Sequence, residues 1–148
     1  MTHICIAVDL RDCGNVGAIA RTATAFGFDA LITVGTTPPL TRKEARKAAL
    51  GGHALPSKHF VTLAAALAAY PEYTPVAIET SGIPIDTWHP QPTTPIALIL
   101  GNERYGLSDR DCALATTVVR IPHQTAKVAS LNVASAFAIA AYTLWMVH

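Results

Sequence analysis

The chain has 148 residues, of which 51% are hydrophobic and only 14% are charged, and its formal net charge is +1 at pH 7. This length fits one domain, residues 1–148, and the scarcity of charged side chains favours a buried interface between subunits. The near-neutral balance excludes a general attraction to polyanions, so any affinity for nucleic acid has to come from local patches of charge.

Predicted strands and helices alternate along the chain. In the first half we expect a strand at 4–8, a tight loop at 14–17, a helix at 16–26, a strand at 30–34, and a helix opened by a capping box of Thr41 and Glu44 and ended by Gly51. In the second half we expect an alanine-rich helix at 61–69, strands at 75–79 and 96–100, a short helix capped by Ser108, a strand at 118–121 and a closing helix at 131–146. This order predicts an α/β fold with a mainly parallel sheet and helices on both faces.

One segment near the C-terminus is long enough to span a membrane. Residues 128–147 contain no Asp, Glu, Lys or Arg. The segment is mostly alanine and includes hydroxyl and amide side chains, so we interpret it as a helix buried in the core or between subunits. The N-terminal residues lack the basic region and the cleavage site of a signal peptide. We therefore expect no association with a membrane.

Cysteine and histidine usage sets further bounds. The cysteines Cys5, Cys13 and Cys112 are odd in number and form no C-x-x-C pair. This argues against a disulfide framework and favours a reducing, cytoplasmic compartment. The six histidines form no closely spaced pair, so we expect no metal site.

Polar residues gather where the predicted strands end. Asn15 follows the first strand, Thr80 the third, a glycine-punctuated loop at 101–106 the fourth, and a polar segment at 122–130 the last. Parallel α/β sheets bind ligands at the carboxyl ends of their strands, so these segments predict one ligand site. The chain has no G-x-G-x-x-G after its first strand, no P-loop and no G-x-S-x-G elbow. Its polar residues suit the positioning of reactants and the control of charge, not metal catalysis or an obvious covalent nucleophile.

Three motifs in these segments carry a resemblance to a known family. The first reads Asn-Val-Gly-Ala-Ile-Ala-Arg-Thr-Ala-Thr-Ala-Phe-Gly at 15–27, and the second reads Leu-Ile-Leu-Gly-Asn-Glu-Arg-Tyr-Gly-Leu at 98–107. The third is Ile-Pro at 121–122 followed by Ser-Leu-Asn-Val-Ala-Ser-Ala at 130–136. In this order they resemble the motifs of the SpoU/TrmH-type RNA ribose 2′-O-methyltransferases of the SPOUT superfamily. The resemblance implies S-adenosyl-L-methionine as methyl donor, a C-terminal trefoil knot and an obligate homodimer. It also implies a cofactor pocket lined by Thr80, Leu100, Gly101, Ile121, Ser130 and Leu131.

The resemblance further implies a catalytic set. Arg21 is the candidate for activating the ribose 2′-hydroxyl. Because a guanidinium keeps its proton above about pH 12, we expect it to bind the adjacent phosphate and orient the hydroxyl, not to act as a base. Glu103 is expected to fix Arg21 or the loop of the second motif, Asn15 and Asn132 to hold loop and substrate geometry, and Ser130 to contact acceptor or cofactor. Without the motifs, Arg21 and Glu103 would be interpreted as solvated surface charges, and Ser130 and Asn132 as helix caps.

Two groups of basic residues are candidates for RNA contacts. Arg42, Lys43, Arg46 and Lys47 form adjacent rows at helical spacing, a pattern that suits phosphates and equally an ordinary solvated helix face. Lys127 lies beside the third motif. We expect RNA as substrate, with tRNA favoured over rRNA. The alternatives are a base-methylating SPOUT relative and a non-catalytic RNA-binding factor with the same fold.

Overall fold

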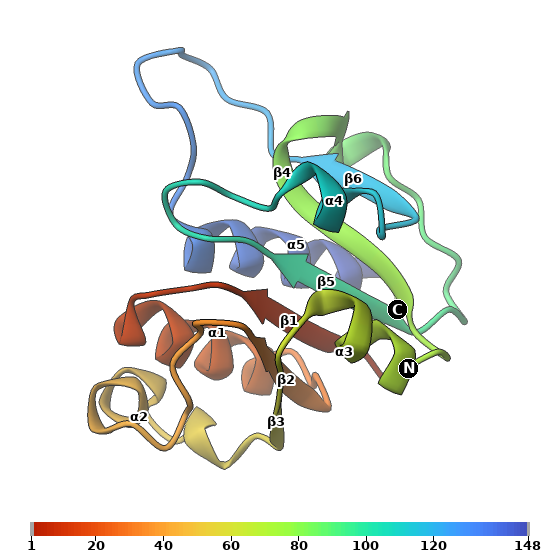
Figure 1. The fold of residues 1–148 in the computed structure, drawn as a ribbon. Coiled ribbons are helices and arrows are strands. Elements are labelled where there is room, and N and C mark those ends of the chain that lie inside the picture. Colours follow the sequence, from red (N-terminus) through yellow and green to blue (C-terminus); the bar gives the residue numbers. More distant parts are fainter. Residues whose placement is uncertain (1, 148) are drawn as a thin grey trace.

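The computed structural model describes residues 2–147 as a six-stranded sheet flanked by helices (Figure 1). The strands are β1 (Ile4–Val8), β2 (Ala30–Val34), β3 (Ser57–Phe60), β4 (Thr74–Pro84), β5 (Ile96–Leu100) and β6 (Thr117–Arg120). They lie in the order β3-β2-β1-β5-β4-β6, and every pair of neighbours is parallel. The predicted α/β fold with a mainly parallel sheet is therefore confirmed.

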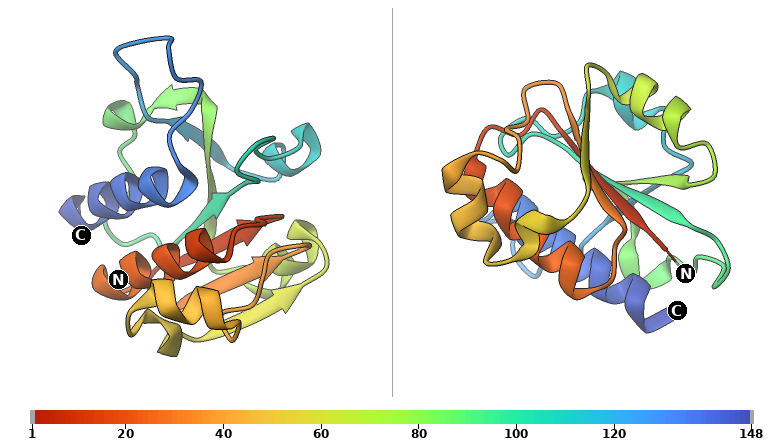
Figure 2. Two further views of the ribbon diagram at one scale, coloured as in Figure 1. Left: turned by 90° about the vertical axis from the view of Figure 1, so that its left-hand side faces the viewer. Right: turned by 90° about the horizontal axis from the view of Figure 1, so that it is seen from below.

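Helices cover both faces of this sheet, as Figure 2 shows. One face carries α1 (Cys13–Ala25), α2 (Lys43–Ala49) and α5 (Val133–Val147), and the other carries α3 (Leu63–Ala69) and the short α4 (Asp109–Cys112). Short 3-10 turns lie at Gly52–Ala54 and Ile85–Thr87. Because both sides are covered, every residue of β1 and β5 is buried.

The chain leaves the two central strands toward opposite faces. β1 leads into α1 on one side of the sheet, and β5 leads through a loop to α4 on the other. Neighbouring strands whose connections diverge in this way leave a crevice at their carboxyl ends, the usual ligand position in open α/β sheets. The two strands pair as far as Ala7 and Leu100. The loops that follow them therefore begin side by side.

The start of α1 differs from the prediction. Residues 14–17 were expected as a tight loop but belong to the helix, because Asp12 caps it by accepting the Asn15 N–H at 3.1 Å. Gly17 allows a close approach of two helices: a Cβ at this position would lie 2.2 Å from the backbone oxygen of Ala45 in α2. Gly17, which suggests a turn when the sequence is considered alone, is instead required for the close packing of α1 against α2.

The remaining elements follow the predictions in part. The strands at 4–8, 30–34 and 96–100 are confirmed at their predicted bounds, and Ser108 caps α4 by accepting the Asp111 N–H at 3.1 Å. The edge strand β3 was missed, because its Ser-Lys-His residues are polar and exposed. The capping box is wrong: the N-cap of α2 is Arg42, which makes no side-chain cap hydrogen bond. The last helix begins at Val133, two residues later than predicted.

The closing helix α5 is divided between core and surface. It buries Phe137, Ala140, Ala141 and Leu144 against the sheet. The opposite side exposes Ile139, Tyr142, Trp145 and Met146. Within residues 2–147, no helix has both the length and the apolar character that crossing a membrane requires.

Candidate active site

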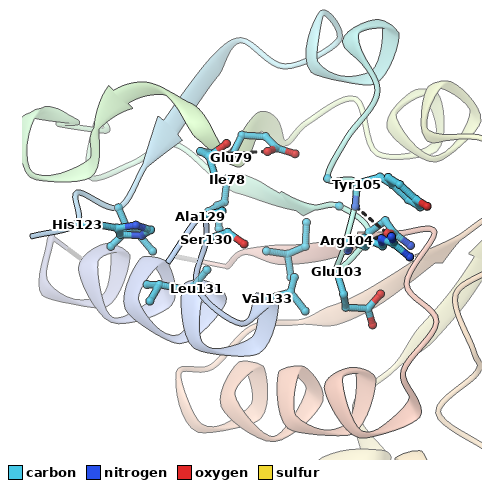
Figure 3. A pocket seen from close by; sticks show the side chains of 17 residues that line it. Ile78, Glu79, Glu103, Arg104, Tyr105, His123, Ala129, Ser130, Leu131 and Val133 are labelled. Atoms are coloured by element: carbon cyan, nitrogen blue, oxygen red, sulfur yellow. Dashed lines mark hydrogen bonds between the residues drawn. The ribbon is translucent and has the colours of Figure 1, made fainter. Parts of the chain in front are cut away.

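The middle of β4 and the segments that follow β5 and β6 line a cavity of about 250 Å³, which the first turn of α5 closes on one side (Figure 3). The end of β5 and the connection after it supply Leu100–Gly106, and the segment before α5 supplies Ala129–Leu131. All the residues predicted for the cofactor pocket line this cavity: Thr80, Leu100, Gly101, Ile121, Ser130 and Leu131. The structure thus brings together residues that are up to 51 positions apart in the sequence (80 to 131).

Glu103 is the centre of a hydrogen-bond network that joins the first two motifs. Its Oε1 accepts the Arg11 N–H at 3.0 Å, and its Oε2 accepts the Asp12 N–H at 2.9 Å and the Asn15 side-chain N–H at 3.1 Å. These donors lie at the junction of β1 and α1, so the carboxylate ties the loop after β5 to the loop after β1. Partial burial alone would raise the pKa of Glu103, but the hydrogen bonds outweigh it and hold the pKa below its ordinary value.

Asn15 extends this network to the third motif. While its Nδ2 donates to Glu103, its Oδ1 accepts the Asn132 Nδ2 at 3.0 Å. Asn132 in turn caps α5, because its Oδ1 accepts the N–H groups of Ala134 at 2.9 Å and Ser135 at 3.2 Å. Glu103, Asn15 and Asn132 therefore form one chain of hydrogen bonds through all the motifs, and the helix cap is Asn132 instead of Ser130.

Two residues that the sequence did not single out hold the loop after β5. Asn102 donates from Nδ2 to the Asp9 backbone oxygen at 2.8 Å, and its Oδ1 accepts the N–H groups of Arg104 and Tyr105, each at 2.9 Å. Glu79, near the end of the buried part of β4, accepts a backbone N–H from the end of the same loop. Asparagine beside glycine is typical of a tight turn, which is the one local signal for Asn102. The role of Glu79 depends on its hydrogen bond with Leu107, which is distant in sequence, so the residues around Glu79 give no such signal.

Arg21 does not join this site in its own chain. It is exposed on α1 and does not line the cavity. Its backbone lies against the 3-10 turn after α2, where a Cβ at Gly52 would be 2.8 Å from the Arg21 Cα. Of the two roles expected for Glu103, a contact with Arg21 is not found within this chain. Its hydrogen bonds agree with the other role, because they fix the loop of the second motif to the connection that precedes α1.

The predicted basic residues lie on the surface, outside the cavity. Arg42 is the N-cap of α2, and Lys43, Arg46 and Lys47 follow on that helix, all exposed. Lys127 is exposed on the long loop between β6 and α5. In Figure 1 this loop extends away from the body of the protein. The structure leaves both groups accessible, and their contact with RNA stays a prediction.

The described residues contain no group of three or more His, Cys, Asp or Glu side chains that could hold a metal ion. Burial raises the pKa of the Cys5 thiol far above its ordinary value. Partial burial, together with the nearby carboxylates of Glu79, Asp109 and Asp111, also raises the pKa of Cys112. Neither thiol is therefore ionised at neutral pH, which argues against both as nucleophiles.

Comparison with known proteins gives consistent matches over almost the whole chain. A curated protein of Synechocystis described as an uncharacterized tRNA/rRNA methyltransferase is 32% identical over 143 residues, which cover 90% of this chain and 49% of that protein. The solved structure of an AdoMet-bound rRNA methyltransferase from Sinorhizobium meliloti matches with a TM-score of 0.85 at 29% identity, over 97% of this chain and 55% of that one. A structure described as an RNA 2′-O ribose methyltransferase matches with a TM-score of 0.83 at 26% identity, over 97% of this chain and 55% of that one.

This chain spans about half the length of those relatives. The family model of the SpoU rRNA methylases matches residues 2–142, a range that includes every member of the hydrogen-bonded chain from Glu103 to Asn132. On this match the chain belongs to the SpoU rRNA methylase family.

Proposed function

We propose that this protein is an S-adenosylmethionine-dependent RNA methyltransferase that transfers a methyl group to a ribose 2′-hydroxyl, with tRNA as the favoured substrate. The observation that carries the proposal is the chain of hydrogen bonds from Glu103 through Asn15 to Asn132 beside the cavity. Membership of the SpoU family and the descriptions of the relatives support it.

The residues around the cavity suit S-adenosylmethionine. Leu100, Ile121 and Leu131 provide apolar surface for an adenine ring, and the backbone around Gly101 provides amide groups. The volume of about 250 Å³ is close to the lower end, about 300 Å³, of the range for small-molecule sites. When bound, this cofactor supplies an electrophilic methyl group on a sulfonium sulfur.

The chain's own residues then have to orient the acceptor. A ribose 2′-hydroxyl is a poor nucleophile unless it is aligned with the methyl group and its proton is removed. The amides of Asn15 and Asn132 are engaged with each other, with Glu103 and with the start of α5, so we assign them to positioning the loops. Ser130, exposed at the cavity, supplies a hydroxyl for contact with acceptor or cofactor.

We propose that the active form is a homodimer that buries the exposed side of α5. Tyr142 and Trp145 stack with ring centroids 5.9 Å apart, and both pack against Phe26 at the end of α1. An exposed apolar patch of this kind marks an interface. An interface on α1 and α5 would bring Arg21 to a second copy of the chain, which accounts for an arginine that belongs to the first motif but not to its own cavity. The C-terminal knot and the cytoplasmic location stay predictions.

The test is methyl transfer from labelled S-adenosylmethionine to unmodified tRNA and rRNA transcripts. Ribose methylation makes the adjacent phosphodiester resistant to alkali, so label in alkali-resistant dinucleotides is the expected result. Label in mononucleotides after alkali would indicate the base-methylating alternative. RNA binding without any label would favour a non-catalytic binding factor.

Arg21→Ala separates the proposed role of this residue from an ordinary surface charge. We expect it to abolish methyl transfer and to leave the Kd of S-adenosylmethionine unchanged, because Arg21 lies outside the cavity. Arg110→Ala is the matched control, since Arg110 is an exposed arginine on α4. Equal activity of the two variants would contradict the assignment of Arg21.

A further inference from the structure

A second hollow adjoins the cavity and shares part of its wall. It is lined by Arg11, Asp12 and Asn15 from the junction of β1 and α1, and by the segment 102–105 from the loop after β5. The same segment also lines the cavity. A molecule in the hollow and a molecule in the cavity would therefore both contact this loop.

Tyr105 presents an aromatic ring at this shared wall. Its side chain is 78% exposed, although the Arg104 guanidinium lies over the ring at 5.4 Å from the centroid. The ring is not needed to shape the loop, because Asn102 holds the Arg104 and Tyr105 N–H groups and bridges to Gly106 through backbone hydrogen bonds in both directions. An aromatic ring exposed on a loop fixed by other groups is preorganised for stacking.

Two exposed guanidinium groups at the hollow can bind an anion. Arg11 and Arg104 are both exposed there. The acidic members are engaged: Glu103 accepts the Arg11 and Asp12 N–H groups, and Asp12 accepts the Asn15 N–H as the cap of α1. Arginine binds phosphate through paired N–H donors, and aromatic rings stack with unpaired bases of any sequence.

We propose that this hollow is the subsite for a nucleotide of single-stranded RNA next to the methylated ribose. Its base stacks on Tyr105, and its phosphate is bound by Arg11 and Arg104. This assignment rests on the proposed function, since it takes RNA as the methyl acceptor. It also requires an acceptor in a loop or bulge, because bases within a helix are not free to stack on a side chain.

The experiment measures the Kd and KM for RNA, with the unmodified tRNA and rRNA transcripts of the activity assay as probes, beside the Kd of S-adenosylmethionine. Tyr105→Ala should raise the Kd for RNA about tenfold, and Tyr105→Phe, which keeps the ring, should stay close to wild type. Arg104→Ala should lower the slope of log Kd against log salt by about 0.7, the value for one phosphate contact on a single strand. The control Arg110→Ala should change neither quantity.

The outcomes distinguish the subsite from the overall function. Loss of RNA affinity in Tyr105→Ala, with rescue in Tyr105→Phe and an unchanged Kd for S-adenosylmethionine, supports the subsite even if no methyl group is transferred. RNA binding by Tyr105→Ala as tight as that of the wild type overturns the subsite alone, whatever the activity. A wild-type protein that binds neither RNA overturns both proposals. Circular dichroism of each variant excludes unfolding as the cause.

Discussion

Glu103→Gln should destabilise the protein at neutral pH, because it removes a charge and one acceptor from the link between β1 and β5. A glutamine oxygen in place of Oε2 can keep the Asp12 and Asn15 donors and the longer bond of 3.3 Å from the Arg11 N–H. The glutamine amide then faces the Arg11 N–H, whose shorter bond of 3.0 Å to Oε1 is lost. A hydrogen bond to a charged group contributes about 1.5 to 3 kcal/mol, and the lower value applies where water competes. For this half-buried carboxylate we expect a loss of about 1.5 kcal/mol in the free energy of unfolding, or roughly 3 to 6 °C in Tm.

The loss should depend on pH. Because the pKa of Glu103 is lower in the folded protein than its ordinary value of 4.5, the ionised carboxylate contributes its full stabilisation above that value. The contribution disappears as the pH falls through the lowered folded pKa. Glutamine does not titrate. The difference in stability between the wild type and Glu103→Gln should therefore be largest near pH 7 and shrink toward about pH 3.

Urea unfolding at a fixed protein concentration, followed by tryptophan fluorescence and circular dichroism at both pH values, measures this difference. Glu72→Gln is the matched control, because Glu72 is exposed. A loss below about 0.5 kcal/mol at neutral pH would be no larger than that of an ordinary surface substitution. That result, or an equal loss at both pH values, would refute the reasoning that the charge of Glu103 stabilises the site.

Gly17→Ala should destabilise the fold by about 1 to 3 kcal/mol, since the added methyl group would lie 2.2 Å from the Ala45 oxygen; thermal unfolding checks this, and an unchanged Tm would contradict it. Asn132→Ala should cost about 1 kcal/mol by removing the cap of α5, and hydrogen exchange should become faster in the first turn of that helix and not in its centre. Trp145→Asp should shift the protein from dimer to monomer in sedimentation, because 56% of this side chain is exposed on the proposed interface. A wild-type monomer, or an unchanged dimer in the variant, would contradict that interface.

Elements that are buried in the sheet were predicted well from the sequence, whereas exposed elements and contacts between residues distant in sequence were not. β1, β2 and β5 were predicted to the residue because their mainly apolar runs are buried within the sheet over all or nearly all of their length. β3 lies at the edge of the sheet, where exposed polar residues give no such signal. Gly17 was interpreted as a turn residue because its packing partner α2 begins more than twenty positions later, so the local sequence gives no sign of the contact between the two helices.

For the site, the order of the motifs predicted which residues meet, but not how they interact. The predicted cofactor residues do line one cavity, and Asn15 does lie between Glu103 and Asn132. The partner of each hydrogen bond depends on the pairing of β1 with β5, which no local sequence pattern contains. For the same reason Asn102 was missed, and Arg21, although part of the first motif, lies outside the cavity.

The position of the network explains why its members come from three separate motifs. β1 and β5 pair only as far as Ala7 and Leu100, and their connections then leave toward opposite faces, so the sheet itself does not hold the two loops together. Glu103 supplies that link by accepting backbone N–H groups at the start of α1, and Asn102 adds a bond to the Asp9 backbone oxygen. Asn15 donates to Glu103 and accepts a hydrogen bond from Asn132, which caps α5 next to the wall of the cavity. The loop after β5 and the first turn of α5 are thus held by one set of bonds, so the geometry of the cavity depends on all three motifs at once.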